Sequence, residues 1–313
     1  MKEGRRYYPL SEYLKERFGC RVYRVTLDGG FTCPTRDGTK GTGGCTYCEP
    51  ATLVPKDHKD GASIGEQLAV GMEKVRKRHG VEKFIAYFQV NTNTYANTER
   101  LRVLYTEATS HPDVLALAVS TRPDCLGDEV LDLLAELKGG GKHLWLEMGL
   151  QSSSDRTLER IGRGHTAGEF SDAAWRARAR GIEVCAHVIF GLPGEGREKM
   201  LDTVKFISRL PVWGIKFHQL DVVKGTALEK EYNGKERNDD ELKLLSLDEY
   251  AGLVVESLEL LPPRVVVHRL SGATPRELLV APRWSLKRSA ARNRIEKLLI
   301  EENTRQGANF QAP

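Results

Sequence analysis

Short apolar runs alternate along the chain with longer segments in which apolar residues recur every three or four positions. The first pattern is typical of buried strands and the second of amphipathic helices. The predicted strands are 21–28, 83–89, 115–121, 143–151, 183–190, 213–223 and 264–270. The predicted helices are 11–18, 63–79, 97–110, 127–137, 154–161, 167–180, 195–209, 246–261 and 287–302, and 224–245 is expected to be irregular.

Strands that alternate with helices predict a parallel sheet with right-handed crossovers. Six strand-and-helix units lie between residues 21 and 223. We therefore expect an α/β fold built on a partial TIM-like (β/α)6 barrel. An N-terminal helix within 1–20 would precede the barrel at 21–223. A C-terminal α/β extension at 224–313, ending in a basic helix, would follow it.

Composition narrows the protein class only slightly. Apolar residues make up 40% and charged residues 29% of the 313 positions, which is ordinary for a globular protein. No apolar run in the sequence is long enough to span a membrane, and residues 1–20 contain no apolar signal core. We therefore expect a cytoplasmic protein with reduced thiols and no membrane partner.

The net charge of +4 is mild, but the basic excess is local. Six basic residues lie between Arg283 and Lys297, against one acid, Glu296. This run is either the solvated face of a terminal helix or a surface that binds phosphate groups.

Three cysteines mark the most specific motif of the chain. Cys33 is followed by Cys45 after eleven residues, and Cys48 comes two residues later. Cysteine thiolates hold iron–sulfur clusters, usually four of them. Three thiolates would leave one iron of a four-iron cluster open for chemistry. Tyr47, beside the last cysteine, could cover the site.

The same cysteines also permit an interpretation without catalysis, in which they bind a structural metal ion. Cys45 and Cys48 could form half of a structural zinc site with Cys33 and His58. Such a site normally has a second close pair of ligands, and none follows in the sequence. A disulfide is disfavoured because nothing marks the chain as secreted. The spacing alone leaves the cluster and the zinc site open.

Polar residues gather where each predicted strand ends. In a βα barrel, reacting groups lie on the loops after the carboxyl ends of the strands. Each residue taken singly is more often a turn or cap residue. The ordered set around one rim favours a site, and it comprises Gln89, Asn91, Thr92, Asn93, Thr94, Tyr95, Ser120, Arg122, Asp124, Glu147, Gln151, Arg163, His165, His187, His218 and Asp221.

With these blocks the chain resembles the radical S-adenosylmethionine (SAM) enzymes. The cysteine motif, 120–124, 146–152, 163–166 and 189–194 resemble the radical SAM core of the Elongator catalytic subunit and of oxygen-independent coproporphyrinogen oxidase. The small bacterial YhcC type is most similar. Its first characteristic segment resembles residues 21–45 of this chain, and its last resembles residues 269–278. The resemblance covers roughly 10–285.

The resemblance implies a role for individual residues. Cys33, Cys45 and Cys48 would bind a [4Fe-4S] cluster, and the remaining residues would hold SAM. The segment 89–94, with Asn91 and Asn93, takes the place where family members usually carry Gly-Gly-Glu or Gly-Gly-Thr for the methionine amino group. The other positions are Ser120 and Gln151 near the ribose, Arg163 at the methionine carboxylate, and His187 near ribose and adenine.

The implied reaction is generation of a 5′-deoxyadenosyl radical that takes a hydrogen atom from a substrate. The family resemblance and the basic run favour a tRNA nucleoside, modified or remodelled at the carbon 5 side chain of the wobble uridine. The chain ends at Pro313 without an acetyltransferase-like segment, which argues against acetyl-CoA-dependent chemistry. Alternatives are a radical SAM enzyme for a small metabolite and a zinc-stabilised nucleic-acid-binding protein without catalysis. An electron donor such as flavodoxin or ferredoxin is implied.

Arg122, Asp124, His165, His218, Arg269 and Ser271 are the residues left for contact with the substrate. Each is as readily explained by a structural role as by a functional one.

Overall fold

The computed structural model describes residues 4–54, 61–234, 242–287 and 289–311, and its centre is a seven-stranded sheet. The strands follow the order β1-β2-β3-β4-β5-β6-β8, and every neighbouring pair is parallel. Their bounds are β1 Val22–Leu27, β2 Lys83–Phe88, β3 Val114–Thr121, β4 His143–Gln151, β5 Glu183–Phe190, β6 Gly214–Gln219 and β8 Val266–Arg269. The predicted α/β fold with a parallel sheet is confirmed.

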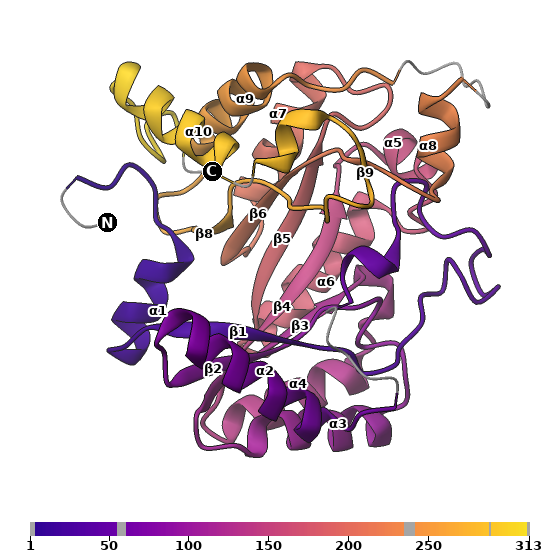
Figure 1. Ribbon diagram of the computed structural model, residues 1–313, viewed down its shortest axis with the longest axis vertical. Coiled ribbons are helices and arrows are strands. Elements are labelled where there is room, and N and C mark those ends of the chain that lie inside the picture. The colour runs from indigo at the N-terminus through magenta and orange to yellow at the C-terminus, as the bar shows by residue number, and fades with distance from the viewer. Residues whose placement is uncertain (1–3, 55–60, 235–241, 288, 312–313) are drawn as a thin grey trace.

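Helices connect the strands and cover the outer side of the curled sheet (Figure 1). Local capping explains several starts: Ser63, Thr166 and Ser246 each form a reciprocal capping box with the glutamate three residues later. The helices are α1 Leu10–Phe18, α2 Ile64–His79, α3 Thr98–Ser110, α4 Asp128–Gly139, α5 Asp155–Arg160, α6 Ala167–Ala179, α7 Arg197–Ser208, α8 Ala227–Tyr232, α9 Leu247–Leu260 and α10 Ala290–Glu301.

Three expectations need correction. The strand predicted at 213–223 is interrupted: after β6, Val222–Val223 form a separate short strand, β7, which pairs antiparallel with β9 at Leu279–Ala281. The segment expected to be irregular at 224–245 contains helix α8. The strand from the C-terminal extension, β8, joins the barrel sheet beside β6, so the sheet has seven strands rather than six.

Two apolar clusters lie on the two faces of the sheet. The larger one fills the space between the outer face and the helices. The smaller one lies inside the curve, at the amino ends of the strands, where Leu10 and Leu14 of α1 pack beside Trp145. Tyr8 accepts a backbone hydrogen bond from Val267 on β8, at 2.7 Å. Helix α1 thus lies in the gap between β1 and β8 (Figure 1) and closes the sheet at the amino ends of its strands, which we call the lower end.

Within the described ranges no helix combines the length and apolarity that crossing a membrane requires.

Candidate active site

The inner face of the sheet changes from apolar to polar toward the carboxyl ends of β2 and β3. On β2, Ile85 and Tyr87 belong to the lower apolar cluster, but Tyr87 also lines a cavity above it, as does Gln89 directly after the strand. On β3, Ala118 and Ser120 repeat this change. Because side chains two positions apart point to the same face of a strand, the change places polar groups at the carboxyl ends of the strands. The cavity there has a volume of about 240 Å³.

This cavity brings most of the predicted site residues together. It is lined by Cys33, Cys45, Tyr47, Cys48, Asn91, Ser120, Gln151, Arg163 and His187. Asn93 is buried next to it and does not line it. The amide of Asn93 donates to the carbonyls of Asn91 and Ser120, at 3.4 and 3.1 Å, so this side chain ties the two loops together.

The cysteine loop is held in place by the neighbouring strand ends. Asn91 donates to the carbonyl of Phe31 at 2.8 Å, and Thr92 donates to Cys33 Sγ at 3.4 Å. On the other side, the backbone amide of Thr46 donates to the carbonyl of Ile161 at 3.0 Å. These contacts explain how a glycine-rich loop keeps its three cysteines at one wall of the cavity.

The thiols of this loop differ in their acidity. Burial alone would raise the pKa of Cys33, but hydrogen bonds from Thr35 and Thr92 outweigh it and lower that pKa from its ordinary value. Burial, with the nearby charge of Cys45, raises the pKa of Cys48 to about 11. Cys33 is therefore the more easily ionised of the two, and thiolate is the form that binds metal.

The spacing of the three sulfur atoms argues against a single zinc ion. Among the described residues, the sulfur atoms of Cys33, Cys45 and Cys48 do not all lie within 4.8 Å of one another, so at least one pair is farther apart. Ligands of one tetrahedral zinc would lie closer together than that, because each zinc–sulfur bond measures about 2.3 Å. A cluster places each thiolate on a different iron. The proposed fourth zinc ligand, His58, lies outside the described residues.

Arg163 and Gln151 meet over a glycine. Arg163 Nη2 donates to the carbonyl of Gly149 at 2.9 Å, and Nη1 approaches Cys45 Sγ at 3.7 Å. A methyl group built on Gly149 would lie 2.5 Å from Arg163 Nη2 and 2.6 Å from Gln151 Nε2. The absence of a side chain at Gly149 therefore allows both polar groups to approach the cavity.

Two of the predicted residues have an unusual backbone. Asn91 and Gln151 have φ values of 60° and 74°, in the left-handed region that disfavours side chains. The pairing of β4 with β5 also shifts register between Gly149 and Gln151. Such strained conformations gather at functional sites, where the surrounding structure holds them.

A buried charge network forms the floor of the cavity. Glu147 Oε2 lies 2.7 Å from Lys216 Nζ and 2.6 Å from His187 Nε2, and Trp145 donates to Oε1 at 3.0 Å. Burial alone would raise the pKa of Glu147, but Lys216 and His187 hold it well below the usual range. Burial lowers the pKa of His187 to about 4. At neutral pH His187 is therefore neutral and donates to an ionised Glu147.

Lys216 and Tyr87 were missed by the sequence reasoning. Lys216 is 1% exposed and its ammonium donates to Tyr87 Oη at 3.3 Å. Ser120 donates to the same oxygen at 3.0 Å. A lone lysine inside the apolar strand GIKFHQ was the available signal, because an ammonium is buried only when it is paired.

Glu147, Cys185 and His268 place one ligand atom each within 4.8 Å of the others. The Glu147 carboxylate is already neutralised by the ammonium of Lys216 at 2.7 Å. A cation there would meet that positive charge, so we assign no metal to this group.

Several of the residues considered for contact with the substrate instead connect parts of the scaffold. Asp124 accepts two hydrogen bonds from Arg122 at 3.0 Å and lies 2.7 Å from Lys40, which attaches the third strand end to the cysteine loop. The ring of His165 lies 3.1 Å from the carbonyls of Gly149 and Thr166. The remaining three residues border a cavity. His218 lines the cavity of about 240 Å³, Ser271 lines a second cavity on the open side of the sheet, and Arg269 lines both.

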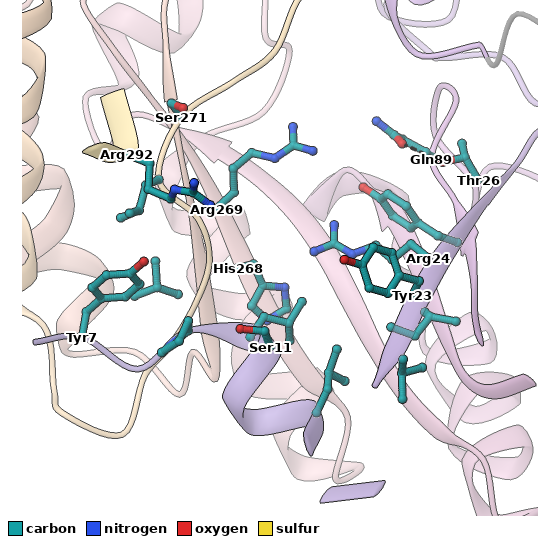
Figure 2. Close-up of a pocket in the computed structure, with 18 of the residues that line it drawn as sticks. Tyr7, Ser11, Tyr23, Arg24, Thr26, Gln89, His268, Arg269, Ser271 and Arg292 are labelled. Carbon is teal, nitrogen blue, oxygen red and sulfur yellow. Dashed lines mark hydrogen bonds between the residues drawn. The ribbon is translucent and has the colours of Figure 1, made fainter. Parts of the chain in front are cut away.

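The open side of the sheet forms a second cavity of about 720 Å³ (Figure 2). It lies between the edge strands β1 and β8, above α1, and is lined by residues of all three elements. Tyr87, Gln89 and Arg269 line both cavities. A substrate could therefore reach the smaller cavity from this side.

The smaller cavity is suited to the expected cluster and SAM. Three cysteines from one loop share its wall, and the buried Arg163 Nε and Asn93 Oδ1 have no hydrogen-bond partner within the described part of the chain. Buried polar atoms are normally satisfied, so unpaired ones indicate that a bound group completes them. A guanidinium suits the carboxylate of SAM.

Known proteins support the same conclusion. Residues 212–301 match the Radical_SAM C-terminal domain. The uncharacterized protein YtqA of Bacillus subtilis is 40% identical over 98% of this chain and 94% of its own length. Protein YhcC of Escherichia coli is 40% identical over 94% of this chain and 93% of its own length.

More distant proteins share the fold. The solved structure of the archaeal Methanocaldococcus infernus Elp3 matches with a TM-score of 0.67 at 17% identity, covering 91% of this chain and 64% of that one. The tRNA uridine(34) acetyltransferase of Dehalococcoides mccartyi is 25% identical, over 58% of this chain and 38% of its own length. Residues 38–207 match the family model of the Radical SAM superfamily, and the chain belongs to this family of enzymes, which use a [4Fe-4S] cluster and S-adenosylmethionine.

Proposed function

We propose that this radical SAM enzyme modifies or remodels a tRNA nucleoside, with the carbon 5 side chain of the wobble uridine as its target. The observation that carries this proposal is the wide cavity beside the cofactor site. Its lining includes Arg24, Arg269 and Arg292, and its volume of about 720 Å³ is ample for a nucleotide. A basic entrance attracts a substrate that carries phosphate groups.

Distant relatives support the choice of tRNA. One of them is named tRNA uridine(34) acetyltransferase, and another tRNA-2-methylthio-N(6)-dimethylallyladenosine synthase. The latter, from Fusobacterium nucleatum, is 26% identical over 77% of this chain and 58% of its own length. We extend to this chain only the substrate class that the two names share.

The residues of the smaller cavity would have different roles in binding the cluster and SAM. Cys33, Cys45 and Cys48 would hold the cluster, and Arg163 and Gln151 would hold SAM. When bound, the cluster and SAM supply an organic radical that removes a hydrogen atom from the substrate. Tyr47 and the closed lower end of the barrel keep water from the reacting groups. An electron donor such as flavodoxin or ferredoxin would reduce the cluster.

The decisive experiment compares the modified nucleosides of tRNA from cells with and without the gene, by liquid chromatography and mass spectrometry. We expect one substituted uridine to disappear and its precursor to accumulate. The purified, anaerobically reconstituted enzyme should then convert the precursor in tRNA from the deletion strain when given SAM and a reductant.

Identical nucleoside profiles from the two strains would contradict the proposal. A change confined to the pool of small metabolites would instead favour the alternative radical SAM function on a free metabolite. The zinc-stabilised binding protein is no longer an alternative, because the chain belongs to an enzyme family.

A further inference from the structure

Two arginines approach each other across the open side of the sheet. Arg24 lies on β1 and Arg269 ends β8, and these strands are the two edges of the seven-stranded sheet. Figure 2 shows the two side chains extending toward each other into the larger cavity, from opposite walls. The curl of the sheet thus brings together residues that are separated by most of the sequence.

Neither guanidinium has an acidic partner. Across the described ranges, no salt bridge and no hydrogen bond from the side chain of Arg24 or Arg269 is formed, although both are half-buried. Arg24 instead lies over the ring of Tyr87, 5.5 Å from its centre. By contrast, the buried Arg122 is paired with Asp124.

The nearest buried acid is already committed. Glu147 is fully buried and contacts Lys216 and His187 at 2.7 and 2.6 Å. The negative charge of Glu147 is therefore already balanced by the ammonium of Lys216 and does not neutralise Arg24 or Arg269. Burial and the charge of Arg24 lower the pKa of Arg269 from its ordinary value, which reflects the uncompensated positive charge. Two like charges in a half-buried cavity are unfavourable until an anion joins them.

We propose that Arg24 and Arg269 together bind an anionic group of the substrate, a phosphate or a carboxylate. The carboxylate is planar and the phosphate is tetrahedral, but each has two oxygen atoms that can accept paired hydrogen bonds from one guanidinium group. Arg269 lines both cavities, so the bound anion lies at their junction, next to the cofactor site. Arg292, from α10, lines the same larger cavity and adds a third positive charge.

The proposal rests on the proposed function only for the identity of the substrate. A phosphate would come from the nucleic-acid backbone. A carboxylate would belong to the substituent that is being changed. The two sources place the substrate differently. A backbone phosphate would hold the nucleic-acid strand, whereas a carboxylate would hold the reacting substituent itself.

The first test uses inorganic phosphate and acetate as probes on the reconstituted enzyme. Thermal unfolding is followed while the probe replaces chloride at constant ionic strength. We expect one probe to raise the melting temperature in a saturable way, and the variant carrying Arg24→Gln and Arg269→Gln to bind it about tenfold more weakly or not at all. The matched control is Arg21→Gln, an exposed arginine just before the same strand, which should bind as wild type does.

The outcomes separate the possibilities. Protection by phosphate alone identifies the phosphate source, and protection by acetate identifies the carboxylate. If neither anion protects the wild-type protein, or if the double variant is protected equally, the arginine pair is not an anion site. Circular dichroism and iron content verify folding. Should the double variant not fold, Arg24→Lys and Arg269→Lys keep the charge but lose the fork and should still weaken binding.

A second test uses tRNA from cells that lack the protein. Arg269→Gln should lower substrate conversion strongly, through a raised KM if phosphate is bound and through a lowered kcat if the reacting carboxylate is bound. An unchanged conversion rate and KM would overturn the proposal. Anion protection without any tRNA conversion would leave the arginine site standing while the proposed function fails.

Discussion

Gly149 sets the geometry of the smaller cavity, because a single added methyl group would meet two of the side chains that line it. Its carbonyl oxygen accepts from Arg163 at 2.9 Å, and the ring of His165 lies 3.1 Å from the same oxygen. The space where a side chain would stand is filled by the polar ends of Arg163 and Gln151. Because those ends are flexible, a larger residue would displace them rather than unfold the strand.

Gly149→Ala should therefore weaken SAM binding about tenfold, since a hydrogen bond to a charged group contributes roughly 1.5–3 kcal/mol and part of it would be lost. Isothermal titration of SAM into the reconstituted protein measures this. The matched control is Gly139→Ala, at the end of α4, where an added methyl group meets nothing within 4 Å. Equal SAM affinity in the two variants would show that Arg163 and Gln151 do not hold SAM.

Arg163→Ala tests the same contact directly. SAM affinity should fall by roughly 1.5–3 kcal/mol, because the guanidinium would bind the methionine carboxylate. The iron content should persist, since Arg163 is not a cluster ligand. An unchanged affinity would limit Arg163 to its observed contact with the carbonyl of Gly149.

The three loop cysteines should be individually essential for the cluster. Anaerobic reconstitution should give about four irons per chain, and Cys33→Ala, Cys45→Ala or Cys48→Ala should abolish this uptake. Cys20→Ser is the control, because Cys20 packs beside the lower apolar cluster, far along the strand direction from the loop. Full iron uptake by any of the three variants would remove that cysteine from the ligand set.

The residues that the sequence did not reveal share one property. Arg24, Tyr87 and Lys216 lie inside strands and belong to none of the motifs, whereas most of the predicted residues lie on the loops or, like Ser120 and Gln151, at the carboxyl ends of the strands. The motifs lie mostly where the strands end, so they do not include polar residues such as Arg24 and Lys216 nearer the middle of a strand. Which strand residues face the cavity depends on the register and curl of the sheet, and neither is written in a single strand's pattern.

At the scale of elements, periodicity predicted the long helices and the six parallel strands of the barrel correctly. It failed for α8, β7 and β9, which have only two to six residues each. Their positions depend on distant partners: β7 pairs with β9, and the amide of Leu228 on α8 donates to the carbonyl of Thr46 at 2.9 Å. Elements that short cannot be stable by themselves, so tertiary contacts decide them.

Helix α10 presents its basic residues unevenly. Arg294 lies 2.5 Å from Asp248 of α9, and Lys297 lies 3.4 Å from Glu301. These pairs make part of the basic run an interhelical and surface charge network. Arg292 lines the larger cavity. Lys287 is exposed, and Arg288 lies outside the described residues. The run is thus less available to phosphate than its sequence implies.

Arg292→Ala should lower the salt dependence of tRNA binding. Each phosphate contact contributes a slope of about −0.9 in a plot of log affinity against log salt, so the slope should flatten by roughly that amount. Lys297→Ala on the same helix is the control and should leave the slope unchanged. Filter binding at several salt concentrations measures both. Equal slopes for Arg292→Ala and wild type would exclude this residue from tRNA contact.

The whole molecule separates an apolar lower end from a polar upper end. The lower end is closed by α1 and by an aromatic group in which His143 lies between Tyr13, Phe18, Trp145 and Trp213. The upper end holds the cavities and the uncompensated arginines. The apolar packing of the lower end, together with the larger cluster under the helices, stabilises the sheet on which the strained and charged residues of the upper end lie.

That lower end should make the stability depend on pH. Burial lowers the pKa of His143 to about 4, while Glu183 opposes this shift and Lys138 and Arg17 add to it. The unfolded histidine has a pKa near 6.5, so the unfolded state binds more protons between about pH 6.5 and 4. Stability from this residue is complete above pH 6.5 and is lost as the pH falls toward 4.

At 1.36 kcal/mol per pKa unit, the loss from His143 between pH 7.5 and 5 is about 2 kcal/mol. His143→Phe should remove this part of the pH dependence, because phenylalanine keeps the aromatic packing without a proton to bind. Urea unfolding of wild type and variant at the two pH values, anaerobically and at equal iron content, measures the difference. Parallel pH profiles for the two proteins would show that His143 has the same pKa in the folded and unfolded states. The aromatic group would then have to accommodate an imidazolium at pH 5 beside the hydroxyl of Tyr13, 3.3 Å away.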